Sequence, residues 1–96
     1  MRWRVHYMPE ATSIIRNLAP EVKATVRRAI HELADNPFVG KELQGDLAGF
    51  RSHRVRRYRI VYLVNESESS LDVYYVGPRR DVNKAFAELL REDSGL

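Results

Sequence analysis

The part of this sequence best suited to chemistry is a short basic segment in its second half. Residues 51–59 contain five arginines and no acidic residue, and the net charge of +3 less these five leaves −2 for the remaining residues. Arginine presents a rigid fork of donors that suits phosphate and stacks on bases. A basic patch on an otherwise near-neutral chain favours a polyanionic partner, most simply nucleic acid. The alternative is a solvated strand whose charges disperse into water.

His53 lies inside this arginine segment and is the residue best suited to act as a general base. Nearby positive charge disfavours the imidazolium form, which predicts a lowered pKa and a neutral ring near pH 7. A neutral imidazole beside phosphate-binding guanidiniums could take the proton of a ribose 2′-hydroxyl, which is metal-free ribonuclease chemistry. The alternative is that His53 merely decorates a basic strand.

Arg59, from the end of this segment, and two arginines further along the chain are candidates for holding a phosphate. Arg79 and Arg80 come just before an expected helix N-terminus, where the helix dipole disfavours cations. Side chains that break a local rule without a structural gain often mark functional sites. Arg59 lies near the start of an apolar strand, out of phase with its apolar residues, and is either a surface charge or points into the open face of the sheet.

Composition excludes several other classes of site. The chain has no cysteine, and its three histidines lack the spacing of metal ligands, so we expect no metal and no cofactor. The longest strongly apolar run, residues 60–64, is far too short to span a membrane. The N-terminus shows no signal-peptide pattern. We therefore expect one soluble, cytoplasmic domain over residues 1–96 that has no membrane partner.

Periodicity predicts an α+β fold that positions the basic segment on a sheet. The expected order is a strand at 3–7, helices at 11–18 and 20–35, a loop at 38–49, strands at 50–56, 58–64 and 71–77, and a helix at 82–90. Strands joined by such short connections pair antiparallel. We thus expect a helix hairpin packed on a mainly antiparallel four-stranded sheet, with a C-terminal helix.

Alternation along the basic strand distributes its side chains over both faces. Arg51, His53 and Arg57 fall on one side, and Arg54 and Arg56 fall on the other. Because both sides carry arginine, neither face of this strand can be fully buried. We expect the strand to form an edge of the sheet or to line a cleft.

Three segments of the sequence also resemble a known family. They are Gly49-Phe50-Arg51-Ser52-His53-Arg54-Val55, Tyr58-Arg59-Ile60-Val61-Tyr62 and Val76-Gly77-Pro78-Arg79-Arg80-Asp81-Val82. Together with the preceding helix hairpin, they are similar to toxins of the RelE/ParE superfamily, and the resemblance covers nearly the whole chain.

The resemblance implies the toxin of a type II toxin–antitoxin system. Its partner would be a separately encoded cognate antitoxin, with which it could form a hetero-oligomer on operator DNA. In the RelE branch the toxin enters the ribosome and cleaves mRNA, which inhibits translation. The ParE branch instead poisons DNA gyrase and has no nuclease site, and a third alternative is a catalytically weak member that only binds its antitoxin. The density of arginines favours the RelE branch.

The resemblance also implies roles for single residues. Arg51 and His53 match two basic positions on the second strand, Arg59 matches the third-strand arginine, and Arg79 matches the arginine after the last strand. The implied catalytic residues are His53, Arg59 and Arg79, with His53 as the base because arginine stays protonated. The implied RNA-binding residues are Arg51, Arg54, Arg57 and Arg80. One departure is Asn83, where many RelE-like sequences have a tyrosine that stacks on or orients the substrate.

Overall fold

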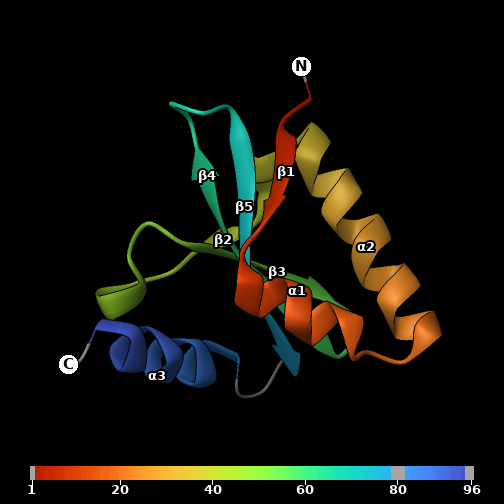
Figure 1. The fold of residues 1–96 in the computed structure, drawn as a ribbon. Coiled ribbons are helices and arrows are strands. Elements are labelled where there is room, and N and C mark those ends of the chain that lie inside the picture. The colour runs from red at the N-terminus through yellow and green to blue at the C-terminus, as the bar shows by residue number, and fades with distance from the viewer. Residues whose placement is uncertain (1, 79–81, 95–96) are drawn as a thin grey trace.

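The structure, a computed structural model, describes residues 2–78 and 82–94 of the chain (Figure 1). The α+β order expected from the sequence is confirmed. The elements are β1 (Arg4–Tyr7), α1 (Pro9–Arg16), α2 (Pro20–Asp35), β2 (Lys41–Glu42), β3 (Arg51–Val55), β4 (Tyr58–Asn65), β5 (Ser70–Pro78) and α3 (Val82–Ser94). Two short 3-10 turns, η1 (Pro37–Val39) and η2 (Gly45–Leu47), flank β2.

Prolines set the ends of the helix hairpin. Pro9 and Pro20 begin α1 and α2, where the missing N–H costs no helical hydrogen bond. The second helix ends at Asp35, just before Asn36 and Pro37, because a residue that precedes proline is pushed out of the helical region. The apolar side chains of both helices then face the sheet, where Ala11, Val26 and other residues are buried.

The sheet has five strands among the described residues, in the spatial order β1-β5-β4-β3-β2. Strand β1 runs parallel to β5, and the other neighbours are antiparallel. The prediction of four strands was one short, because β2 lies inside the segment expected to be a loop. A strand of two residues has no alternation to recognise, and β2 is defined only by its pairing with Arg51 and Ser52.

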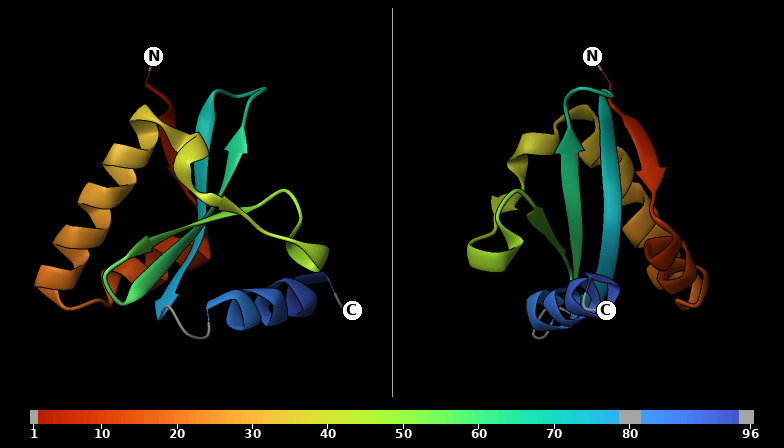
Figure 2. Two further views of the ribbon diagram at one scale, coloured as in Figure 1. Left: turned by 180° about the vertical axis from the view of Figure 1, so that it is seen from behind. Right: turned by 60° about the vertical axis from the view of Figure 1, so that its left-hand side comes forward.

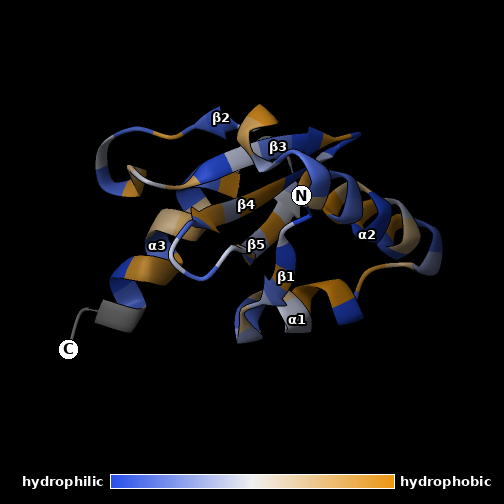
Figure 3. Cartoon of the chain, turned by 90° about the horizontal axis from the view of Figure 1, so that it is seen from above, coloured by the Kyte–Doolittle hydropathy of each residue, from blue (hydrophilic) through white to orange (hydrophobic). Residues whose placement is uncertain are grey.

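Helices cover the sheet from both sides. The core between the sheet and the α1–α2 hairpin contains Ile30 and Leu33 of α2 and Ile60 of β4. The core on the other side contains Val61 of β4 and Phe86 of α3. Figure 3 shows α2 and α3 on opposite sides of the strands. These two faces are called the α2 side and the α3 side below.

The β3–β4 hairpin reaches toward the N-terminal half of α2 (Figure 2). This placement decides which of its arginines face solvent and which face a helix. In the part of the chain that the structure describes, no helix is long and apolar enough to cross a membrane.

Candidate nucleic-acid interface

The register of the β3–β4 hairpin sorts its basic residues onto two faces. Val55 pairs with Tyr58 across a two-residue turn, so Arg54 lies directly opposite Arg59, and His53 lies opposite Ile60. Directly paired residues share a face of the sheet. Because Ile60 belongs to the core on the α2 side, His53 lies on the α2 side, whereas Arg54 and Arg59 lie on the α3 side.

Arg59 is half-buried and held in place by one hydrogen bond. Its Nη1 donates to the Ser52 hydroxyl at 3.0 Å, and Ser52 itself is buried. Arg54 is exposed, and neither arginine forms an ion pair with a carboxylate of the described residues. Like charges directly opposite each other destabilise a sheet. A bound anion would remove this repulsion and accept hydrogen bonds from both guanidiniums.

Lys41 extends this pair into a row of cations. It is exposed on β2 and lies opposite Ser52, on the same α3 side. Arg59 lies opposite Gly77, near the end of β5. We call Lys41, Arg54 and Arg59 the cationic face. Arg79 and Arg80, which the sequence marks as phosphate-binding candidates, follow β5 and lie outside the described residues.

His53 is not brought together with Arg59. It lines a cavity of about 220 Å³ with Glu32 and Leu33 of α2, with Asn36, which follows that helix, and with Val39 of η1. Burial lowers the pKa of His53, while the Glu32 carboxylate raises it. The direction agrees with the sequence prediction, but the main cause is burial rather than neighbouring arginines. The imidazole of His53 therefore lies on the opposite face of the sheet from a phosphate that Arg59 would hold on the α3 side.

Arg51 also lies on the α2 side, and its guanidinium is engaged by the chain itself. One amino group donates to the carbonyl oxygens of Phe38 at 3.2 Å and Gly40 at 2.8 Å. The other donates to the Glu42 carboxylate at 3.0 Å, and the guanidinium lies over the Phe38 ring. These contacts leave 19% of the side chain exposed. Arg51 therefore anchors the segment around η1 and β2.

Tyr62 supports the same segment from the core. Its hydroxyl donates to the carbonyl oxygen of Pro37 at 2.6 Å and accepts from the backbone N–H of Gly40 at 3.0 Å. A Cβ at residue 40 would collide with this hydroxyl, so the position requires glycine. Strand β2 is thereby held against β3, which places Lys41 beside the two arginines.

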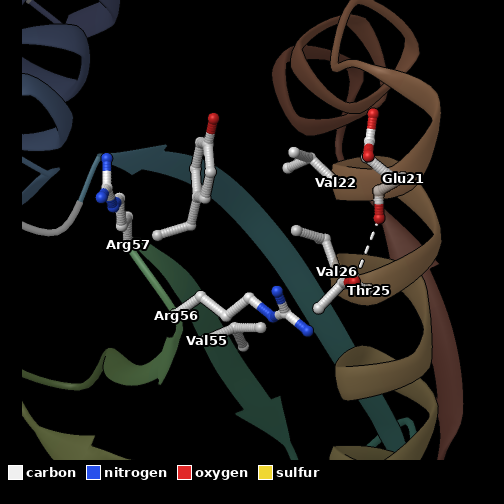
Figure 4. Close-up of a pocket in the computed structure, with 8 residues that line it drawn as sticks. Glu21, Val22, Thr25, Val26, Val55, Arg56 and Arg57 are labelled. Atoms are coloured by element: carbon white, nitrogen blue, oxygen red, sulfur yellow. Dashed lines mark hydrogen bonds between the residues drawn. The ribbon is translucent and has the colours of Figure 1, made fainter.

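Arg56 and Arg57 form the turn of the hairpin. The strand expected to reach residue 56 ends at Val55, since Arg56 has a φ of 55° and leaves the extended conformation. Because the strand has ended before residue 57, the prediction that Arg57 shares a strand face with Arg51 and His53 is wrong. Both arginines line a groove of about 700 Å³ between the hairpin and α2 (Figure 4). The other lining residues are Glu21, Val22, Thr25, Val26, Val55 and Tyr58.

Sequence reasoning missed Lys41 and the role of Ser52. Lys41 belongs to a strand too short to be recognised, and Ser52 matters only through its hydrogen bond to Arg59. A signal for the arginine pair was nevertheless present. Two-residue connections are the commonest in hairpins. A two-residue loop at 56–57 would have placed Arg54 opposite Arg59.

Comparison with known proteins shows the family to which this chain belongs. Residues 5–86 match the family described as ParE-like toxin of type II bacterial toxin-antitoxin systems. The chain belongs to this family, and so to the RelE/ParE toxin superfamily that its motifs indicated. No curated protein sequence matches the chain significantly.

Solved structures agree with this assignment. A chain of the toxin–antitoxin complex RelBE2 from Mycobacterium tuberculosis is 28% identical, with a TM-score of 0.76 over 82% of this chain and 100% of that one. The isolated RelE toxin of E. coli is 19% identical, with a TM-score of 0.72 over 95% and 98% of the two chains. A chain of the RelE–RelB complex from Pyrococcus horikoshii is 21% identical, with a TM-score of 0.67 over 83% and 98%. The last two likenesses concern the fold alone.

Proposed function

We propose that residues 1–96 form one toxin domain that cleaves mRNA on the ribosome and holds the RNA backbone on its cationic face. The observation that carries the proposal is Arg54 directly opposite Arg59 on one face, with no carboxylate paired to either among the described residues. This is a site for an anion with several acceptor oxygens. A ribosomal target also implies a cytoplasmic location.

The proposed chemistry is transesterification at one phosphodiester. The ribose 2′-oxygen loses its proton and attacks the adjacent phosphorus, the bond to the 5′-oxygen of the next nucleotide breaks, and that oxygen takes up a proton from water. The products are a 2′,3′-cyclic phosphate and a 5′-hydroxyl. Arg59 and Arg54 bind the phosphate and stabilise the negative charge that develops on its oxygens. Arg79 is proposed to join them at the reacting phosphate, while Arg57 and Arg80 contact flanking phosphates.

The proton acceptor has to come from outside the cationic face. Guanidinium and ammonium groups are not bases at neutral pH, and His53 lies on the other face of the sheet. We therefore leave His53 out of the proposed catalytic set, and Arg51 out of the RNA-binding set. Positioning of the substrate together with electrostatic stabilisation supplies the rate, and the ribosome or solvent takes the proton. A requirement for the ribosome fits a cationic face that, in the part of the chain that the structure describes, holds no base of its own.

The same absence of a base favours one second candidate. A ParE-like gyrase inhibitor needs no nuclease site, and the family that the chain matches is described as ParE-like. In that case the cationic face serves binding alone. A cell-free translation reaction and a gyrase supercoiling assay, run with the same purified protein, separate the two functions.

The outcomes of these paired assays differ clearly. The mRNA proposal predicts a loss of protein synthesis, with mRNA fragments that appear only when the message is translated, and unchanged supercoiling. Inhibited supercoiling with intact mRNA would establish the gyrase function instead. Activity in neither assay would leave a member that only binds its antitoxin.

The partner we propose is a cognate antitoxin. The matching structures from Mycobacterium tuberculosis and Pyrococcus horikoshii are toxin–antitoxin complexes. On this chain, the groove between α2 and the β3–β4 turn offers the half-buried side chains of Val22, Val55 and Tyr58. Arg56 and Arg57 at its rim suit acidic residues of the antitoxin. The resulting hetero-oligomer is proposed to bind operator DNA.

A further inference from the structure

A second concentration of positive charge lies on the helix hairpin, away from the cationic face. A cavity of about 290 Å³ opens between β1, α1 and α2. Its lining residues are Tyr7, Thr12, Ile15, Arg16, Lys23 and Arg27. Three of these six side chains are cationic and none is acidic. We call this cavity the hairpin pocket.

Two of the three cations of the hairpin pocket, Lys23 and Arg27, are placed against the ordinary rules of helix stability, whereas Arg16 lies in the last turn of α1, where the helix dipole favours a cation. Lys23 and Arg27 are four residues apart on α2, which makes them neighbours on one helix face, and like charges at this spacing destabilise a helix. Lys23 also lies in the first turns of α2, where the helix dipole disfavours cations. Arg16 adds a third positive charge from the end of α1. A bound anion would remove the repulsion between Lys23 and Arg27.

Within the described residues, no carboxylate neutralises these cations. Arg16, Lys23 and Arg27 take part in none of the ion pairs of the described chain. Arg16 and Arg27 are exposed and Lys23 is half-buried, so all three can turn toward a ligand. Long cationic side chains around a concave surface are the features that recognise phosphate.

Tyr7 adds a neutral donor to the lining of the pocket. It is half-buried on β1 and packs against the core on the α2 side. Burial raises the pKa of its phenol, and the charge of Arg27 lowers it, which places the guanidinium within electrostatic reach of the hydroxyl. The hydroxyl is therefore protonated at neutral pH and can donate to an anion.

We propose that the hairpin pocket binds a phosphate group of RNA, and so gives this toxin a second RNA contact on the side opposite the cationic face. The identity of the polymer rests on the proposed function. Three cations and one hydroxyl suit a group with several acceptor oxygens. Ile15 is the only aliphatic lining residue, so an acidic peptide would bury little apolar surface here. Two cationic surfaces on opposite sides suit a cleft lined by RNA.

The test is an NMR titration with a single-stranded 2′-O-methyl RNA of about twelve nucleotides, which cannot be cleaved through the 2′-oxygen. In the wild type, the backbone amides of Tyr7, Thr12 and Lys23 should shift and saturate. The double variant Lys23→Ala/Arg27→Ala should lose these shifts. It should also reduce the slope of log K against log salt by about 1.4, since two phosphate contacts are lost.

Matched variants make the result specific. Arg28→Ala removes an exposed arginine of α2 that does not line the hairpin pocket, and it should leave the shifts unchanged. The variant Arg54→Ala/Arg59→Ala should keep the shifts at the hairpin pocket while it loses those near β3. The amide spectrum of each variant shows whether it is folded.

Several outcomes would overturn the proposal. Unshifted amides in the folded wild type, or equal shifts in Lys23→Ala/Arg27→Ala, would show that the pocket does not bind RNA. An acidic peptide or inorganic phosphate that saturates the same amides at the same concentration as the RNA would refute a site selective for RNA phosphate. Failure of mRNA cleavage in translation reactions would refute the proposed function alone, because this titration uses no ribosome.

Discussion

Adjacent residues of β3 act on different sides of the molecule, because a strand turns successive side chains to opposite faces. Arg51 and His53 lie on the α2 side, where they anchor a loop and line a small cavity. Ser52 and Arg54 lie on the α3 side with Arg59. The sequence indicated that arginine and phosphate belong together here. Alternation separated Arg54 from Arg51 and His53, but it did not show that Arg59 shares the face of Arg54, because that depends on the hairpin register.

The first prediction at this scale concerns the pH dependence of stability. Burial lowers the pKa of His53 in the folded protein, so below about pH 6.5 the unfolded chain binds the proton more readily. Stability should therefore fall as the pH is lowered through this range. Urea denaturation at a series of pH values should show a smaller fall for His53→Gln than for the wild type. The variant Glu32→Gln should show a larger fall, because the Glu32 carboxylate raises this pKa. Parallel curves for all three proteins would contradict the assignment.

A second prediction concerns the hydroxyl of Tyr62. Tyr62→Phe leaves the Pro37 carbonyl and the Gly40 N–H without their buried partner, which should cost about 1–3 kcal/mol of unfolding free energy. Thermal denaturation measures the effect. The control is Tyr58→Phe, because the Tyr58 hydroxyl makes no hydrogen bond with another described residue. Equal melting temperatures for the two variants would show that the hydroxyl of Tyr62 does not hold the loop.

The β3–β4 hairpin is the element that builds the candidate site. The helices and the long strands of the fold could be predicted from periodicity, because each repeats its pattern over several residues. Strand β2 could not be predicted, since Lys41 and Glu42 are held in place by β3 and by the loop contacts of Arg51. The turn was misplaced by one residue because arginine rarely adopts a positive φ.

This turn carries a prediction of its own. Arg56 has a φ of 55°, a conformation that costs a residue with a Cβ roughly 1–2 kcal/mol. Arg56→Gly should remove part of that cost and raise the melting temperature by a few degrees, since about 1 kcal/mol shifts a domain of this size by about 4–8 °C. Arg57→Gly is the matched control, because Arg57 has no positive φ, and it should lower the melting temperature. The reverse order of the two variants would contradict the turn geometry.

At the scale of the whole molecule, the sheet lies between the cationic face and the groove proposed for the antitoxin. The α3 side carries the cationic face, whereas the α2 side carries the groove proposed for the antitoxin. An antitoxin in that groove need not cover Arg54 or Arg59 directly. The antitoxin would then inhibit the toxin by its size, because the bound complex would be too large to enter the ribosome.

Antitoxin binding should be visible as stabilisation. A partner that binds only the folded toxin raises its melting temperature with the logarithm of the partner concentration. The double variant Arg56→Glu/Arg57→Glu should reduce this shift, because it reverses the charge at the rim of the groove. The control is Arg28→Glu, which makes the same kind of charge reversal at an exposed residue of α2 that does not line the groove. Identical shifts for the wild type and both variants would place the antitoxin elsewhere.

The central claim is that Arg59 holds the phosphate at which mRNA is cut on the ribosome. Primer extension on an mRNA translated in a cell-free extract, with purified wild type, Arg59→Ala or Arg28→Ala added, tests it most directly. A charge that stabilises the transition state is worth about 10²–10³ in rate. We therefore expect translation-dependent cleavage by the wild type and Arg28→Ala, and at least about a hundredfold less by Arg59→Ala. Cleavage by Arg59→Ala at the wild-type rate, or no cleavage by the wild type, would contradict the claim.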